Sequence, residues 1–281
     1  MHKIAPHLLG LFSILILSFV ILPGPVQAQN HIQSFRYGKI DWSNGIVEAE
    51  ALGKPPKKAV NIAQARAMAK SEAINLARKN LVEVVSRIRI DSKAIIGNLI
   101  EQREIIGIKI KGFLKSAHVV DLSYNGDGSV KAKVSFELNK NFTDLVLPKS
   151  IRNIEPIKQS QTANGEVKEA YTGLVVDCRG LGIKSALAPK IIDEEGNVVF
   201  GPAYVSRDFA VKKGMAGYVK DIEAAKSSPR VADRPIIIKG IRSPKKAPSD
   251  IVISNSDAAK IRGTASNLEF LQKCRVIIVL E

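Results

Sequence analysis

One run of the sequence restricts the possible folds more than any other: the segment from Asn61 to Ile88 contains neither glycine nor proline. Asn61 can cap a helix, with Gln64 three residues later as in a capping box. The apolar residues that follow recur at helical spacing and are mostly alanines in the first half: Ile62, Ala65, Ala69, Ala73, Leu76, Ala77, Leu81, Val84, Val85 and Ile88. We therefore expect one helix of roughly 40 Å at 1.5 Å per residue, whose alanine-rich half lies close against a sheet.

Strand patterns stand on both sides of this helix. The expected elements are a strand at Ile46–Leu52 after an Asn-Gly turn, a shorter helix within Ser92–Glu104, a strand at Ile106–Phe113, and a hairpin of Val119–Tyr124 with Val130–Leu138 around Asn125–Gly128. Together they predict a domain over residues 40–147 in which one long helix packs on a bent antiparallel sheet. Residues 29–39 before it are expected to be a tail.

A polar stretch with prolines over residues 148–168 predicts a linker, and residues 169–281 predict a second, small mixed α/β domain. Its expected elements are strands at Thr172–Cys178, Lys190–Ile192, Val198–Phe200, Pro235–Gly240, Asp250–Ser254 and Arg275–Leu280, a helix over Ala210–Lys226, and a helix from about Asp257. The fold class expected for the whole chain is α+β.

The first 28 residues have the layout of a cleavable signal peptide. Lys3 supplies a basic start, Leu8–Leu22 is apolar but shorter than the ~20 residues of a spanning helix, and Val26-Gln27-Ala28 offers a cleavage site after Ala28. The expected location is the periplasm, with outer-membrane association as an extension and an uncleaved N-terminal anchor as the alternative. Gln29 stands where a lipoprotein would have its lipidated cysteine.

The chain is strongly basic, with a net charge of +15. Removing Lys3 with the signal leaves 41 basic and 27 acidic residues, a net charge of +14. An exported protein with this balance meets lipid head groups, acidic polysaccharide and other proteins rather than nucleic acid. The sequence also contains no nucleic-acid-binding motif, so no nucleic-acid partner is expected.

Two cysteines, Cys178 and Cys274, lie at the edges of apolar strand-like runs. Disulfides persist in an oxidising compartment, so a bridge between neighbouring strands is one expectation. Two buried free thiols are the other, because cysteine is often buried without a bridge.

Few residues carry a recognisable chemistry. Lys109, Lys111, Lys131 and Lys133 alternate on two expected strands, and would either form a basic surface for anionic lipid or polysaccharide or guard exposed strands against edge pairing. Arg179 and Lys184 flank a Gly-x-Gly turn that could hold an anion, although ordinary turn geometry also explains the glycines. His118 as the base of an unfamiliar hydrolase is a third possibility. No cofactor and no metal site is expected.

The N-terminal domain also resembles a known group of envelope domains. The stretches that carry the resemblance are Ile40–Gly45, Gly53–Pro56, the Ala-Gln-Ala-Arg-Ala segment from Ala63, Gly112–Phe113 and Ala117–Val120. They are similar to the domain shared by small bacterial surface lipoproteins and the N-terminal domain of the flagellar assembly protein FlgT, over about Ile40 to Leu138. This resemblance implies a non-catalytic assembly domain without family catalytic residues.

The C-terminal domain resembles uncharacterised exported bacterial proteins that carry a Leu-Val-Val-Asp-x-Arg-Gly-Leu-Gly segment, here Leu174–Gly182. That resemblance implies no activity. We therefore expect a non-enzymatic interaction or assembly protein of the envelope, whose partners are envelope proteins or further copies of itself. The alternative is a binding module for an anionic lipid head group or polysaccharide.

Overall fold

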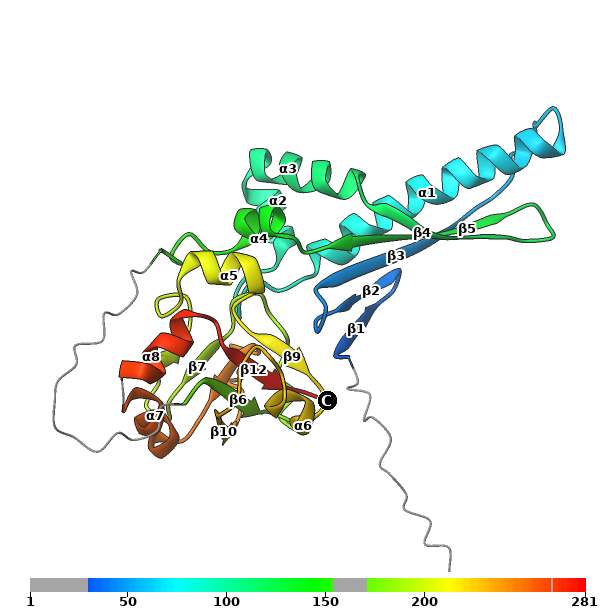
Figure 1. Ribbon diagram of the computed structural model, residues 1–281. Helices are drawn as coiled ribbons and strands as arrows, with labels where there is room; N and C mark the ends of the chain where they lie inside the picture. The colour runs from blue at the N-terminus through cyan, green and yellow to red at the C-terminus, as the bar shows by residue number, and fades with distance from the viewer. Residues whose placement is uncertain (1–29, 154–170, 264) are drawn as a thin grey trace, which may run out of the picture.

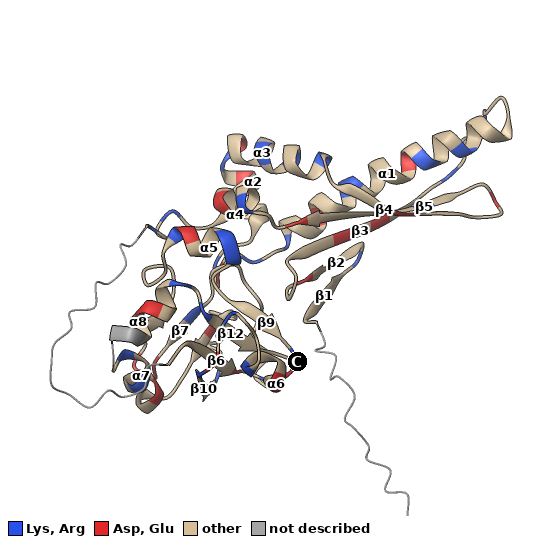
Figure 2. Cartoon of the chain, viewed as in Figure 1, with Lys and Arg blue, Asp and Glu red and all other residues tan. Residues whose placement is uncertain are grey.

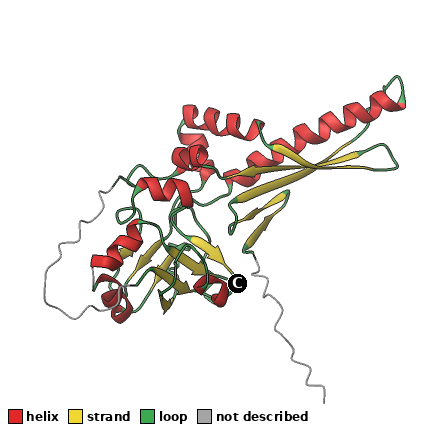
Figure 3. Ribbon diagram, in the orientation of Figure 1, coloured by secondary structure: helices red, strands yellow, loops and turns green. Residues whose placement is uncertain are grey.

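The structure of the protein is a computed structural model, which describes residues 30–153, 171–263 and 265–281. The expected signal peptide, its cleavage site after Ala28 and most of the expected linker lie outside the described residues. The chain has the expected α+β class, with an N-terminal part over residues 30–153 and a C-terminal part over residues 171–281 (Figures 1 and 3).

The N-terminal part is an antiparallel sheet crossed by a long helix (Figure 1). Its strands are β1 (Ile32–Phe35), β2 (Gly38–Asp41), β3 (Ile46–Gly53), β4 (His118–Tyr124) and β5 (Val130–Glu137), in the order β1-β2-β3-β5-β4. Its helices are α1 (Ile62–Ser86), α2 (Ile96–Gln102), α3 (Glu104–Lys115) and α4 (Lys140–Val146). The expected first strand, the long helix, the shorter helix and the hairpin are confirmed as β3, α1, α2 and β4–β5.

Helix α1 begins as its sequence predicts and buries most of its expected apolar side, although Ile62 and Leu76 of that side are exposed. The Asn61 side chain accepts a hydrogen bond from the Gln64 amide at 2.8 Å, which satisfies one of the free amides of the first turn. Ala69, Ala73 and Ala77 form its buried face. A side-chain carbon on Gly53 of β3 would lie 2.1 Å from the carbonyl oxygen of Ala69. Small residues on both elements therefore let the helix backbone approach the sheet.

The expected strand at Ile106–Phe113 is wrong, because these residues belong to helix α3. Gly107, Ile110 and Leu114 are its buried residues, at intervals of three and four that suit a helix. The alternating isoleucines and lysines also fit a strand, but only the helical arrangement buries this stripe. Ile105 and Ile108 are consequently left exposed.

The expected tail over residues 29–39 is also wrong. Strands β1 and β2 form an antiparallel hairpin that pairs Phe35 with Gly38 and Ile32 with Asp41. Gln33 on β1 accepts a hydrogen bond from the Trp42 indole at 3.0 Å. Strand β1 is short, and the turn between β1 and β2 has no strong sequence signal. The sequence pattern alone therefore did not distinguish this hairpin from an unstructured N-terminal tail.

The C-terminal part contains a parallel sheet and a smaller sheet beside it (Figure 1). The parallel sheet has the order β10-β6-β12-β9, from β6 (Gly173–Asp177), β9 (Gly217–Val219), β10 (Pro235–Lys239) and β12 (Val276–Val279). The smaller sheet has the order β11-β7-β8, from β7 (Lys190–Ile192), β8 (Val198–Phe200) and β11 (Asp250–Val252). The helices are α5 (Arg207–Lys213), α6 (Ile222–Lys226), α7 (Asn255–Arg262) and α8 (Ala265–Gln272).

One expected helix of the C-terminal part divides into three elements. Residues 210–226 contain the end of α5, strand β9 and helix α6. Gly214 ends α5 with φ of +73°, a conformation that favours glycine. The Asp221 side chain then starts α6 by accepting from the Ala224 amide at 2.7 Å. The other strands expected in this part, and the helix from about Asp257, are confirmed in place.

Of the two expectations for the cysteines, the structure has the second: Cys178 and Cys274 are free thiols, and both are buried. Strand β6 pairs with β12 in parallel, with Asp177 beside Val279. Cys178 therefore lies level with residue 280, several residues along the strand direction from Cys274. At about 3.3 Å per residue this separation greatly exceeds the ~4.4–6.8 Å between the Cα atoms of a disulfide.

No helix within the described ranges combines the length and the apolarity needed to cross a membrane.

Candidate functional site

The four lysines expected to share one sheet face are not together. Lys109 and Lys111 lie on helix α3, which carries basic positions in Figure 2. Lys131 and Lys133 lie on strand β5. Lys131 forms an ion pair with Glu50 of β3 at 2.9 Å, and Lys133 lies beside Glu50 in the strand register. The open face of the sheet thus carries charges of both signs, so the basic sheet surface expected from the sequence is wrong.

The Arg179–Lys184 loop follows β6 as expected, but Arg179 and the Gly180 amide bind carboxylates of the chain itself. The Arg179 guanidinium donates to both oxygens of Asp177, at 2.8 and 2.6 Å. These bonds hold the pKa of Asp177 below its ordinary value. The Gly180 amide donates to the carboxylate of Glu281. Gly180 and Gly182 have φ of +79° and +63°. These positive values fit the interpretation of the two glycines as ordinary turn residues.

His118 is exposed at the first position of β4. No hydrogen bond or ion pair of its side chain occurs among the described residues, and no carboxylate is placed to orient it as a base. Within the described part of the chain, no three His, Cys, Asp or Glu residues gather in a group that could hold a metal ion.

A cluster that the sequence did not reveal joins the two parts of the chain. The Trp42 ring meets the Tyr218 ring edge-on, with 5.4 Å between centroids. The Ser43 hydroxyl donates to the carbonyl of Tyr218 at 2.7 Å. His31 bonds Ser185 through Nε2 at 2.9 Å and the Glu281 carbonyl through Nδ1 at 3.2 Å. We call Trp42, Ser43, His31, Ser185 and Tyr218 the seam cluster.

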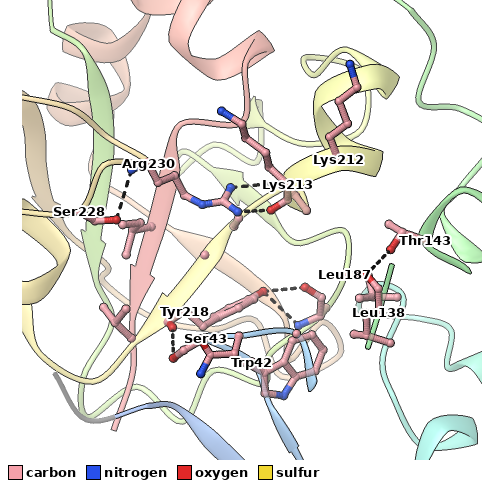
Figure 4. A pocket seen from close by; sticks show the side chains of 18 of the residues that line it. Trp42, Ser43, Leu138, Thr143, Leu187, Lys212, Lys213, Tyr218, Ser228 and Arg230 are labelled. Atoms are coloured by element: carbon pink, nitrogen blue, oxygen red, sulfur yellow. Dashed lines mark hydrogen bonds between the residues drawn. The ribbon is translucent and has the colours of Figure 1, made fainter. Parts of the chain in front are cut away.

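The seam cluster adjoins a cavity of about 280 Å³ between the two parts (Figure 4). Lys212, Lys213 and Arg230 line it from the C-terminal part, and Glu137 and Leu138 from the N-terminal part. The Arg230 guanidinium donates to three backbone carbonyls, those of Lys213, Gly214 and Cys274, and burial lowers its pKa. These carbonyls belong to the end of α5 and the turn before β12. Arg230 therefore holds chain segments together at the wall of the cavity.

Further contacts close the remainder of the seam. Arg207 of α5 donates to the Asp144 carboxylate at 2.9 Å and to the carbonyls of Asp144, Pro148 and Ile151. The Ser92 hydroxyl donates to the Asp250 carboxylate at 2.6 Å. A single buried apolar cluster includes residues of both parts. The two parts are thus held together by packing as well as by hydrogen bonds.

The opposite end of the N-terminal part projects away from this seam (Figure 1). The first half of α1 and the distal ends of β3, β4 and β5 form this projection, which we call the arm. It carries several exposed large apolar side chains: Leu52, Val60, Ile62, Met68 and Tyr124. Leu76, Val119 and Val120 are also exposed, nearer the middle of the N-terminal part. Concentrated apolar exposure on one part of a molecule is typical of an interaction surface.

Strand β4 forms one edge of the sheet, and all of its residues except Leu122 are exposed. The Asn125 amide donates to the Ser129 carbonyl at 2.9 Å, and β4 pairs with β5 in the same register down to Asp121. Because hydrogen-bonded and non-hydrogen-bonded pairs alternate in antiparallel strands, the amides of Leu122 and Tyr124 point away from β5. The edge therefore presents free backbone donors and acceptors.

This edge has only part of the usual protection: a bulge between Val119 and Asp121 and the Asp121 carboxylate interrupt its first half, whereas Leu122–Tyr124 has neither. The edge strand β10 of the parallel sheet begins with Pro235 and ends with Lys239, two residue types that discourage strand pairing. Strand β4 contains neither lysine nor proline. Its one irregularity is a bulge between Val119 and Asp121. The absence of lysine and proline from β4 was visible in the sequence. It indicates a possible pairing edge only because the structure places β4 at the edge of the sheet.

Comparison with known proteins adds one match. Residues 173–281 match the family model described as Treponema pallidum Tp0624, second domain. The match begins at the first residue of β6 and includes the whole parallel sheet. No curated protein matches the chain. The matched range does not include the N-terminal part. The resemblance of the N-terminal part to the FlgT domain therefore stays a prediction.

Proposed function

We propose that this protein is a non-enzymatic interaction protein of the bacterial envelope, and that strand β4 binds an extended segment of a protein partner. The observation that carries the proposal is the open β4 edge, which has no lysine or proline, outward amides at Leu122 and Tyr124, and exposed side chains at Val119 and Val120. A strand added to such an edge gains main-chain hydrogen bonds, while pockets for alternate side chains give specificity.

Two features of the sequence support the envelope as the location. The start of the chain has the pattern of a signal peptide, which favours the periplasm. The N-terminal part resembles the domain shared by surface lipoproteins and FlgT, and we propose the same assembly role for it. The rigid seam with the C-terminal part would hold the β4 edge in a fixed direction.

The alternative function expected from the sequence, binding of an anionic component by the lysines or the Arg179–Lys184 loop, has less support. Lys131 is paired with Glu50, and Arg179 with Asp177. An anion would have to displace a carboxylate at either place. Lys109 and Lys111 lie on a different element and add nothing to these pairs.

Photo-crosslinking in cells tests the proposal. A photoreactive side chain replaces Val120, which is 52% exposed on β4, and in a matched control replaces Ile237, which is 46% exposed on the edge strand β10. We expect a discrete crosslinked protein from position 120 that position 237 does not give. The absence of an adduct at position 120, or the same adducts from both positions, would contradict the proposal.

A further inference from the structure

The end of the arm combines the most exposed apolar side chains with a cluster of cations. Val60 is 85% and Ile62 75% exposed, the highest values among the large apolar side chains of the described residues. They flank the start of α1, where the arm projects farthest (Figure 1). We call residues 54–62 the arm tip. The turn at residues 125–128 supports it, since a side-chain carbon on Gly128 would lie 3.4 Å from Pro55.

These apolar side chains are held outward by the start of the helix. The Asn61 side chain accepts from the Gln64 amide, and the Gln64 side chain accepts from the Val60 amide, both at 2.8 Å. This reciprocal pair fixes the backbone on both sides of Asn61. Ile62 begins the helix in line with the buried alanines but is 75% exposed at the helix start, so no rearrangement of the helix is needed to present it.

The charges around the tip are mostly positive. Lys54, Lys57, Lys58, Arg66 and Lys70 lie within residues 54–71, a stretch without an acidic residue. Against these five cations, the carboxylates beside the tip are those of Glu72 and Asp127.

Glu72 accepts a hydrogen bond from the Lys54 amide at 2.9 Å. Asp127 accepts from the amide and the hydroxyl of Ser129 at 2.9 and 2.6 Å. The arm tip therefore keeps a clear excess of positive charge around two exposed aliphatic groups.

We infer that the arm tip docks on an anionic lipid bilayer, with Val60 and Ile62 at the boundary of the acyl chains and the surrounding cations at the lipid phosphates. Aliphatic groups combined with lysine and arginine are the chemistry of interfacial membrane binding. The tip is the projecting end of a narrow arm, and a fluid head-group layer can close around such a shape. An acidic protein would need a matching concave surface. This inference goes beyond the proposed function, because the tip and the β4 edge use different residues.

Fluorescence of an indole placed at the tip tests this inference in the full chain. Val60→Trp is compared with Ile237→Trp on β10, and the native Trp42, which is buried, gives the same background in both. The probe is vesicles of equal parts phosphatidylglycerol and phosphatidylcholine, with brominated acyl chains in a second set. We expect a blue shift and quenching for Val60→Trp and no change for Ile237→Trp. Site-specific quenching separates the tip from any contribution of the apolar segment Leu8–Leu22.

Charge variants complete the test. At about 1 kcal/mol per cation at an anionic surface, Lys57→Gln with Lys58→Gln should raise the lipid concentration for half-maximal quenching roughly 30-fold. Equal quenching in pure phosphatidylcholine vesicles would overturn the role of lipid charge. No quenching in either vesicle, or the same response from Ile237→Trp, would overturn the inference. A shift produced by polyglutamate but not by vesicles would assign the tip to an acidic protein instead.

Discussion

The Trp42 indole of the N-terminal part meets the Tyr218 ring of the C-terminal part edge-on, with 5.4 Å between ring centroids and 65° between planes. Tyr218 also donates to the Ala186 carbonyl at 2.7 Å and accepts from the Ala186 amide at 3.1 Å. Burial raises the pKa of Tyr218, so the hydroxyl keeps its proton. This pair fixes how the two parts sit together and thereby where the β4 edge points.

Tyr218→Phe should lower the free energy of unfolding by about 1–3 kcal/mol, because both polar groups of the buried Ala186 backbone lose their partner. Chemical denaturation followed by the fluorescence of Trp42, the single tryptophan of the chain, measures this loss at the seam itself. Tyr204→Phe is the matched control, since Tyr204 is 38% exposed, and should change little. Equal effects of the two variants would contradict the assigned role of Tyr218.

Stability should fall as the pH falls below about 6.5, because burial lowers the pKa of His31 from that ordinary value. Lys220 lowers it further, while the hydrogen bond to the Glu281 carbonyl and the charges of Asp41 and Glu281 oppose the shift. A carbonyl oxygen can only accept, so Nδ1 carries the proton and Nε2 accepts from Ser185. The unfolded chain then binds a proton near pH 6.5 that the folded chain does not bind, which favours unfolding.

Histidine resonances followed by NMR during a pH titration check this directly. His31→Gln should reduce the pH dependence of the unfolding free energy in the same range. A His31 resonance that titrates above the ordinary value of 6.5 would contradict this prediction.

Both cysteines should resist alkylation in the folded protein. Burial raises the pKa of Cys178 and that of Cys274 to about 12 each, so neither provides an appreciable amount of the reactive thiolate near neutral pH. Mass spectrometry should find both thiols unmodified under native conditions and both modified in denaturant, with or without reductant. A mass that is two hydrogens lower without reductant would indicate the bridge that the strand register argues against.

Two glycine substitutions should have opposite effects. Gly53→Ala puts a methyl group 2.1 Å from the Ala69 carbonyl oxygen and should destabilise the arm by about 1–3 kcal/mol. Gly112→Ala meets nothing within 4 Å and lies inside α3, where alanine is favoured over glycine by roughly 0.5–1 kcal/mol. Thermal unfolding of both variants measures this. A destabilised Gly112→Ala protein would contradict the helical assignment of α3.

Long and strongly periodic segments were predictable from the sequence. Helix α1, the β4–β5 hairpin and the strands of the parallel sheet follow local patterns that tertiary contacts reinforce. Residues Ile106–Phe113 were mispredicted because alternating isoleucine and lysine fits two periods, and only the packing of Gly107, Ile110 and Leu114 selects the helix. The helix expected after Ala210 is interrupted at Gly214, because this residue has a positive φ. The hydrophobic periodicity of the sequence gives no sign of this interruption.

The candidate sites were less predictable, because they depend on which segments become neighbours. Lys131 is paired with Glu50, and Arg179 with Asp177. In the sequence these cations were candidates for binding an anion, but in the structure their charges are balanced by these carboxylates. The contacts of His31 and Tyr218 at the seam join residues that are far apart in the chain. Local sequence patterns cannot predict such contacts. The β4 edge becomes a candidate only when the strand order is known.

The most direct test of the central claim compares Tyr124→Pro with Tyr124→Ala in the crosslinking experiment at position 120. Both variants remove the exposed ring, but only proline removes the amide that points outward from the β4 edge. The account predicts that Tyr124→Pro abolishes the crosslinked product while Tyr124→Ala retains most of it. Equal yields from the two variants would show that no strand pairs with β4 and would contradict the account.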